Sequence, residues 1–419
     1  MLQKVATVAR DDQTSPHGSA RADGRRSVFS RASRSQFWVV GAIAVALGVL
    51  VAITWNPLDL AVYRFGGRSI VDGVPLYAGT DPATGYPFTY PPVAALLFIP
   101  VALLPEQIAI VVWIAAGVVA LAVTLQIFLR VQRVSVSPLQ LGGLVLLASG
   151  LYPVWETYVF GQVNLLLMCA ICYDLLVLRG RWSGVPIGIA AGIKLTPLVF
   201  VVLLVLIGRR TAAVRAMAVF AATVLVGFVL VPSAATTYWT ETVWDAGRVG
   251  GIEYVRNQSV LGTMTRLLGQ EPSTALWLAF AAPVAGAVLV LAALAWRRGA
   301  RDVAVCLAAG SMLLASPISW DHHWVWGAPA LLVLARRAHP VVTVAWAFLL
   351  FVGCRFLTPG GEGRELAWPW WHQLLGNGYV WMLLLTAAAV AVPLWGHTRV
   401  GSRSEQVRHD ASAPTSVRR

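Results

Sequence analysis

Long runs of hydrophobic residues, separated by short polar segments, recur along the chain from about residue 37 to residue 394. Many of these runs approach the ~20 residues that a helix needs to cross the hydrocarbon core of a bilayer. Segments 112–129 and 274–295 are apolar on every face, whereas the strands of a membrane barrel alternate in polarity. The pattern therefore predicts an all-α integral membrane protein.

The hydrophobic runs indicate about twelve transmembrane helices. These are expected at residues 37–54, 107–129, 138–152, 163–178, 184–195, 197–208, 211–231, 274–295, 302–318, 323–336, 340–357 and 378–395. Segment 91–104 is short and bounded by prolines, so we interpret it as re-entrant or as the start of one long bent helix. The chain thus divides into a membrane domain, 36–397, and two polar tails, 1–35 and 398–419, which are expected to be disordered.

Composition supports a membrane protein, because only 12% of the 419 residues are charged and 58% are hydrophobic. Soluble domains carry roughly 25% charged residues. The net charge of +13 could suggest a nucleic-acid partner, but the positive charge comes from Arg in short clusters between apolar runs. We therefore expect no nucleic-acid binding and read the clusters as topology signals.

The Arg clusters occur in alternate loops, which predicts the orientation of the chain, since short positively charged loops stay in the cytoplasm. Starting with the N-terminus inside, the inner loops contain Arg130, Arg133, Arg179, Arg181, Arg209, Arg210, Arg297, Arg298, Arg301, Arg336 and Arg337. Segments 55–90, 153–162, 232–273 and 358–377, with a turn at 319–322, then face outward and hold 11 of the 14 acidic residues of the membrane domain. This predicts a multi-pass protein of the plasma (inner) membrane with both termini cytoplasmic and its site on the extracytoplasmic side.

Asp59 directly follows the first predicted span, at the outer membrane boundary. A carboxylate there can act as a general base. It can equally cap a short helix, as Asp often does. Because ionisable groups near membrane depth tend to mark functional sites, both interpretations stand at this point.

Lys194 is the single lysine in the membrane-embedded part of the chain, the other lysine being Lys4. A buried Lys is costly unless it meets an anion. A phosphate would satisfy it, and so would pairing with Asp59 or Glu156. Gln162 and Asn164 lie near Glu156 in an outer turn on the same side.

Three further outer motifs contain polar or aromatic candidates. Thr89 and Tyr90 stand before Pro91-Pro92, a pattern typical of a belt where the chain re-enters the membrane. The motif Trp320-Asp321-His322-His323 lacks the i, i+4 spacing of helical zinc ligands, so hydrogen bonding to a substrate is favoured over a metal. Arg256 could hold a phosphate or polyol, and the adjacent sequon-like Asn257-Gln258-Ser259 is interpreted as a polar contact rather than a glycan site.

Six motifs occur in one order along the chain: Asp59-Leu-Ala-Val-Tyr63, Phe88-Thr-Tyr-Pro-Pro92, Phe160-Gly-Gln-Val-Asn164, Gly192-Ile-Lys-Leu-Thr-Pro197, Asn257-Gln-Ser259 and Ser316-Pro-Ile-Ser-Trp-Asp-His-His323. In this the chain resembles the actinobacterial polyprenyl-phosphate-mannose-dependent α-1,2-mannosyltransferases over roughly residues 37–395. The resemblance implies a GT-C type glycosyltransferase bundle.

The resemblance also implies the reaction. Such enzymes transfer mannose, with inversion, from polyprenyl phosphate mannose to the 2-hydroxyl of a mannose on a phosphatidylinositol mannoside or lipomannan. No Gly-rich phosphate loop and no D-x-D in an outer segment is visible, which fits a lipid-linked donor and no cofactor or metal.

Roles for the candidate residues follow from the resemblance. Asp59 is expected to be the general base, with His322 and His323 also catalytic. The expected substrate-binding residues are Tyr63, Thr89, Tyr90, Glu156, Gln162, Asn164, Lys194, Arg256, Asn257, Gln258, Trp320 and Asp321.

Three other functions are compatible with parts of this pattern. A transferase of arabinofuranose or another sugar, using a polyprenyl phosphate donor, would have the same fold. A lipid or solute transporter would explain the many helices, but the sequence lacks the repeated half pattern that transporters often show. A structural scaffold would leave the outer charged clusters unexplained.

Overall fold

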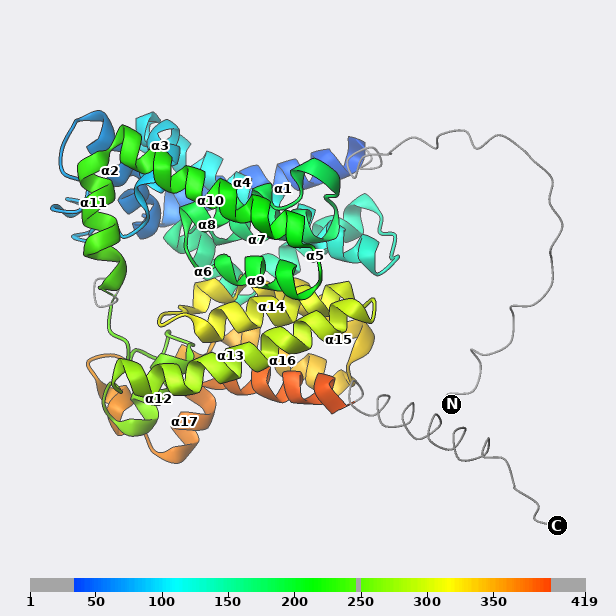
Figure 1. Ribbon diagram of the computed structural model, residues 1–419. Helices are drawn as coiled ribbons and strands as arrows, with labels where there is room; N and C mark the ends of the chain where they lie inside the picture. Colours follow the sequence, from blue (N-terminus) through cyan, green and yellow to red (C-terminus); the bar gives the residue numbers. More distant parts are fainter. Residues whose placement is uncertain (1–33, 246–249, 393–419) are drawn as a thin grey trace, which may run out of the picture.

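The computed structural model describes residues 34–245 and 250–392, which fold into helices joined by loops (Figure 1). Within these ranges the only β structure is a pair of isolated bridges, Thr80 with Pro87 and Asn257 with Trp320. The predicted tails, 1–35 and 398–419, lie outside the described residues except for residues 34 and 35, which begin the first helix. The predicted all-α fold is confirmed.

The helices of the N-terminal part are α1 (Arg34–Thr54), α2 (Leu58–Val71), α3 (Pro92–Leu103), α4 (Glu106–Val131), α5 (Pro138–Ser149), α6 (Tyr152–Phe160), α7 (Asn164–Leu176), α8 (Val185–Ile193), α9 (Leu198–Leu206), α10 (Arg210–Leu230) and α11 (Pro232–Thr240). Those of the C-terminal part are α12 (Val260–Leu268), α13 (Thr274–Arg297), α14 (Arg301–Ala315), α15 (Gly327–Arg337), α16 (Pro340–Val352), α17 (Trp370–Gly376) and a last helix, Gly378–Val392. Short 3₁₀ turns include η2 (Gly180–Trp182), η3 (Thr242–Trp244), η5 (Asp321–Trp326), η6 (Cys354–Phe356) and η7 (Arg364–Ala367).

Four helices, α1, α4, α10 and α13, are long and apolar enough to cross a membrane. Two bent pairs, α5 with α6 and α17 with Gly378–Val392, raise that number to six if each pair is one span. The other predicted spans coincide with shorter helices, of which α14 is the longest with 15 residues. The protein is thus a helical membrane protein with several spans, and the count of about twelve stays a prediction.

The surfaces of α1 and α10 show why these helices need lipid. Only 22% of the apolar window of α1 and 17% of that of α10 is buried in the protein. Large side chains such as Ile53 and Val229 are consequently exposed. Apolar patches of this extent are unfavourable in water, so these faces are suited to acyl chains.

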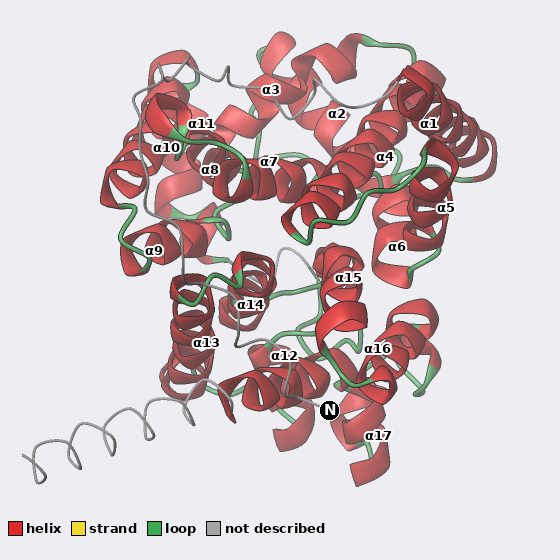
Figure 2. Ribbon diagram, turned by 90° about the vertical axis from the view of Figure 1, so that its right-hand side faces the viewer, coloured by secondary structure: helices red, strands yellow, loops and turns green. Residues whose placement is uncertain are grey.

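The helices pack into a bundle with distinct ends. α1 packs against α4 and α5, α4 against α7, α8 against α10, and α13 against α14. In Figure 1, α2, α3, α11, α12 and α17 gather at the left end of the bundle, while α1 begins and Gly378–Val392 ends at the right. The view along the bundle in Figure 2 shows only helices and loops around its interior.

Two glycines set the close approach of α8 to α10. A Cβ atom at Gly188 would lie 2.5 Å from the carbonyl oxygen of Ala216, and one at Gly192 would lie 2.4 Å from Oγ1 of Thr223. Small residues four apart allow helix backbones to approach closely in membranes. This packing fixes the carboxyl end of α8, where Lys194 follows as the C-cap residue.

The structure tests one of the two interpretations of segment 91–104, and a re-entrant segment stays a prediction. It forms α3, a separate helix, because Leu104 is extended (φ −71°, ψ 151°) and Pro105 is the N-cap residue of the next helix, α4. A residue before proline is disfavoured in the α region, so one long bent helix does not form. The segments predicted to face outward are also partly helical, since they contain α2, α6, α11 and α12.

Candidate active site

A cavity of about 540 Å³ lies among the ends of several helices and the loops that join them. Many predicted site residues line it together: Asp59, Thr89, Tyr90, Gln162, Lys194, Arg256, Trp320, His322 and His323. Small-molecule sites typically occupy about 300–1,000 Å³ and combine apolar walls with a few polar groups. The dimensions and the lining suit a sugar or a lipid head group.

The turn after α6 holds the amino end of α2, which carries Asp59. Gly161 adopts φ +68°, and a Cβ atom there would lie 2.6 Å from Cβ of Leu60 and 3.0 Å from Cβ of Pro57. Nε1 of Trp113, on α4, donates to the carbonyl oxygen of Gly161 at 2.8 Å. Only glycine fits this left-handed turn and close contact, so the position of Asp59 depends on Gly161.

Asp59 is surrounded by protein but faces the cavity. Burial raises the pKa of its carboxyl to about 6, while a hydrogen bond from Gln162 and the charges of Lys194 and Arg256 oppose that rise. Burial disfavours the charged form of a carboxyl, and nearby donors and cations favour it. The carboxyl is therefore mostly ionised at neutral pH, and its pKa lies close to neutral pH. Both properties are favourable for a general base.

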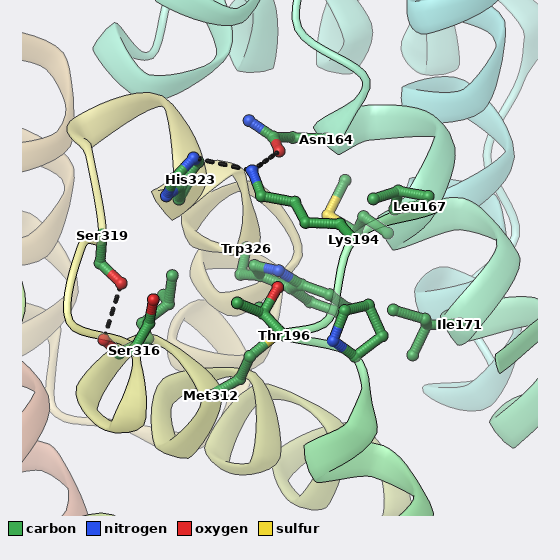
Figure 3. Close-up of a pocket in the computed structure, with 13 residues that line it drawn as sticks. Asn164, Leu167, Ile171, Lys194, Thr196, Met312, Ser316, Ser319, His323 and Trp326 are labelled. Atoms are coloured by element: carbon green, nitrogen blue, oxygen red, sulfur yellow. Dashed lines mark hydrogen bonds between the residues drawn. The ribbon is translucent and has the colours of Figure 1, made fainter. Parts of the chain in front are cut away.

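Lys194 lies where the large cavity meets a smaller pocket of about 30 Å³. Its Nζ contacts Oδ1 of Asn164 at 3.3 Å and Nε2 of His323 at 2.9 Å (Figure 3). Within the described ranges it forms no ion pair, so neither pairing considered for it, with Asp59 or with Glu156, is formed. An ammonium group has three N–H donors, which leaves one for an anion in the cavity.

The smaller pocket is mainly apolar. Leu167, Met168 and Ile171 of α7 face Met312 and Leu313 of α14 across it, as Figure 3 shows for three of them. Lys194, Thr196, Ser316 and His323 line both pockets. A cation and polar groups thus stand at the boundary between a polar chamber and an apolar one.

The two adjacent histidines, on η5, have different surroundings. The ring of His323 makes hydrogen bonds with the backbone of Ile318 and with Lys194. Both ring nitrogens of His322 are buried and have no hydrogen-bond partner in the part of the chain that the structure describes. The carbonyl oxygen of His322 accepts from Oγ1 of Thr157 at 3.1 Å and from Nδ2 of Asn164 at 3.0 Å, which anchors η5 to α6 and α7.

Arg256 is balanced by two carboxylates. Its Nε and Nη2 donate to Asp321 at 2.8 and 2.9 Å, and Nη2 also pairs with Glu156. Its guanidinium lies 4.8 Å from the ring centroid of Phe160. Glu156 and Asp321 do not line the cavity. The cluster joins the loop before α12 to α6 and η5, and Lys194 is left as the cavity cation without a carboxylate partner among the described residues.

Four other predicted residues lie around the cavity rather than in its wall. Tyr63 is buried behind Tyr90, and Asn164 lines the smaller pocket. Asn257 and Gln258 are fully buried. Oδ1 of Asn257 accepts from the backbone of Ser319 at 2.9 Å, and Nε2 of Gln258 donates to the carbonyl oxygen of Gly376 at 2.6 Å.

Tyr238 and Tyr254 also line the cavity but were not among the predicted residues. Both lie in the predicted outer segment 232–273, where nothing in their spacing separates them from other aromatic residues. No group of three or more His, Cys, Asp or Glu side chains suited to a metal ion occurs between residues 34–245 or 250–392. Metal independence stays a prediction.

The multi-span fold, with a carboxylate and an unpaired lysine facing one cavity beside an apolar pocket, is suited to a membrane enzyme that acts on a lipid-linked substrate. Comparison with known sequences defines the class as membrane glycosyltransferases. Residues 88–317 match Glycosyltransferase family 87, and the chain belongs to that family.

Named relatives agree with this assignment. A Mycobacterium tuberculosis protein called polyprenol-phosphate-mannose-dependent alpha-(1-2)-phosphatidylinositol mannoside mannosyltransferase is 34% identical over 425 residues, covering 93% of this chain and 98% of that protein. A Mycolicibacterium smegmatis protein of the same name is 33% identical and covers 83% and 86%. A second Mycobacterium tuberculosis protein, named for phosphatidylinositol pentamannoside, is 33% identical and covers 92% and 94%. No solved structure matches the chain. The resemblance seen in the six motifs is confirmed.

Proposed function

We propose that this chain transfers mannose from polyprenyl phosphate mannose to the 2-hydroxyl of a mannose on a phosphatidylinositol mannoside or lipomannan, forming an α-1,2 linkage. The names of relatives that match nearly the whole chain support the donor, the linkage and the acceptor class. The structural observation that carries the proposal is that Asp59 and Lys194 line one cavity, with Lys194 at the boundary of an apolar pocket.

Lys194 and the histidines are the proposed phosphate site of the donor. The third N–H of Lys194 would face an anion bound at the junction of the two pockets, and the buried ring nitrogens of His322 have no hydrogen-bond partner among the described residues. Fixed donors in a water-poor site stabilise the charge that develops on a leaving phosphate. The mannose of the donor would then extend from the phosphate toward Asp59 in the larger cavity.

Asp59 is the proposed general base. As the acceptor oxygen bonds to the anomeric carbon, its proton passes to the carboxylate, and the carbon–oxygen bond to phosphate breaks with its electron pair on the phosphate. A β-linked donor then gives an α product in one displacement. Because polyprenyl phosphate is a weakly basic leaving group, a strong general acid is dispensable.

Aromatic residues at the cavity wall are proposed to bind the acceptor. The rings of Tyr254 and Trp320 lie 6.4 Å apart at an angle of 63°, and both line the cavity together with Tyr86. Aromatic faces are good stacking partners for sugar rings. Relatives named for phosphatidylinositol mannoside and for its pentamannoside match at 34% and 33% identity. These values do not distinguish the two acceptors, so we propose the acceptor class and not one member of it.

The most direct comparison of candidate functions is a donor assay on membranes that contain the chain. Polyprenyl phosphate mannose should label an added phosphatidylinositol mannoside, and polyprenyl phosphate arabinofuranose should not. Membranes with the empty vector provide the background. Transfer from the arabinofuranosyl donor alone would reject mannose as the donor sugar.

The orientation forms part of the same proposal: a GT-C type bundle of about twelve spans in the plasma membrane, with the cavity facing outward, the membrane domain at 36–397 and the tails 1–35 and 398–419 in the cytoplasm. The alternating Arg clusters support it. The arrangement in Figure 1 also supports it. Helices from the predicted outer segments lie at the left end of the bundle, and the first and last described residues of the chain lie at the right end.

Cysteine labelling tests this orientation. In a variant without the four native cysteines, Thr80→Cys and Glu362→Cys should react with an impermeant reagent in intact cells, and Arg181→Cys should react only after permeabilisation. All three positions are exposed, so accessibility within the protein is matched. If Arg181→Cys is the one variant of the three that reacts in intact cells, the predicted orientation is wrong.

Catalysis is expected to need no divalent metal, because the leaving group is a monophosphate and the His pair lacks further ligands at metal spacing. Treatment with a chelator should leave turnover at its original value, measured with the lipid donor. Activity that is lost on chelation and restored by one particular metal would show the opposite.

A further inference from the structure

The side chain of Gln162 has a defined orientation in the structure. Its Oε1 lies 3.1 Å from Oη of Tyr63 and 3.2 Å from Oη of Tyr90, and it accepts a hydrogen bond from this pair of phenols. Its other end makes a hydrogen bond with Asp59. A carboxylate only accepts hydrogen bonds, so the amide nitrogen must face Asp59 while the carbonyl oxygen faces the tyrosines.

The tyrosines are themselves held in place. Tyr63 lies four residues after Asp59 on α2, which places the two side chains on the same face of that helix. The Oη atoms of Tyr63 and Tyr90 are 2.9 Å apart, and the Tyr63 ring stacks on Phe98 with centroids 4.5 Å apart. Both tyrosines and Gln162 are buried. Rotation of the amide would therefore turn its oxygen toward the carboxylate of Asp59, and two acceptors would face each other in a closed site.

We infer that Gln162 is a positioning residue for the base, oriented by Tyr63 and Tyr90 so that its amide donates to Asp59 and leaves the other carboxylate lone pairs for the acceptor hydroxyl. This rests on the proposed function for Asp59. It differs from direct substrate binding, which the position of Gln162 in the cavity wall would otherwise suggest.

The hydrogen bond has an electrostatic consequence as well as a geometric one. Burial raises the pKa of Asp59 to about 6, and the bond from Gln162 is the largest effect that opposes this rise. The base acts only when ionised, so the rate of the parent protein should fall as pH falls below about 6. Without the amide donor the pKa should rise, and the fall should begin at a higher pH.

Gln162→Met tests the inference, because it keeps the approximate length of the side chain without an amide. The turnover number should fall about ten- to a hundredfold, as expected when a reacting group is misplaced by ~1 Å. The KM values for both lipids should stay unchanged, and the acid limb of the pH profile should move to higher pH. In an Asp59→Asn background the same substitution should cause no further loss.

Tyr90→Phe is the milder companion variant, since it removes one anchor of Oε1 and keeps the amide. It should shift the acid limb in the same direction by a smaller amount. If Gln162→Met lowers the turnover number but leaves the pH profile unchanged, Gln162 has only a structural role. If it raises a KM and leaves the pH profile unchanged, Gln162 binds substrate. Either result overturns the inference.

An infrared titration separates this inference from the proposed reaction, because it needs no turnover. The carboxyl band of Asp59, identified by its absence in Asp59→Asn, should titrate at higher pH in purified Gln162→Met than in the parent. An unshifted band would reject the inference even if mannose transfer is observed. A shifted band would support it even if the donor proved to be another sugar.

Discussion

Asp59→Asn is expected to lower the turnover number by about 10²- to 10⁴-fold, the usual range for loss of a general base. The amide keeps the shape of the side chain but cannot take the proton of the acceptor hydroxyl. KM values for donor and acceptor should change little, because Lys194 and the aromatic wall remain. The measurement is steady-state transfer with purified protein at saturating concentrations of both lipids.

Asp72→Asn is the matched control, since Asp72 caps the other end of α2 and does not line the cavity. It should transfer mannose at the parent rate. Asp59→Glu should retain little activity, because a displacement of the carboxylate by ~1 Å can itself cost about 10²-fold. If Asp59→Asn works at near the parent rate, the base lies elsewhere, and Glu156, Asp321 and the His pair are next to test.

Lys194→Met is expected to raise the KM for the lipid donor by about 10- to 100-fold, in keeping with the ~1.5–3 kcal/mol of a hydrogen bond to a charged group. The side chain keeps its apolar stem but loses the charge that faces the phosphate. The KM for the acceptor should stay the same, because no acceptor group is proposed to contact Lys194. Measurement requires separate titrations of the two substrates.

Lys194→Arg is the companion variant, because it retains the charge while changing the donor geometry. Its KM for the lipid donor should lie between that of the parent and that of Lys194→Met. If the donor dependence of folded Lys194→Met equals that of the parent, Lys194 serves only to hold Asn164 and His323, which it contacts at 3.3 and 2.9 Å.

The sequence predicted the helical fold because long apolar runs have one physical solution in lipid. It made no firm prediction of secondary structure in the segments predicted to face outward, where α2 and α6 form helices. Their apolar positions are mixed with polar ones that serve the cavity, so a hydropathy pattern does not reveal them. The number of crossings also stays open, because α8 and α9 have nine residues each, far below the length of a simple span.

The candidate site was predictable where one residue stood out on its own. Asp59 follows a span directly, and Lys194 is the one lysine in the membrane domain. Partners were not predictable, because they depend on contacts between distant segments. Arg256 forms an ion pair with Glu156, 100 positions away. The sequence had indicated Arg256 as a possible phosphate ligand, but its charge is balanced by this carboxylate. The orientation of Gln162 likewise depends on Tyr90, 72 positions away.

Mannose transfer from the lipid donor can be measured with the purified protein reconstituted in liposomes with radiolabelled polyprenyl phosphate mannose and a phosphatidylinositol mannoside. We expect the acceptor to gain one mannose that a mannosidase specific for α-1,2 linkages releases, and we expect no product from GDP-mannose under the same conditions. Transfer from GDP-mannose but not from the lipid donor, or a product that this mannosidase leaves intact, would contradict this expectation.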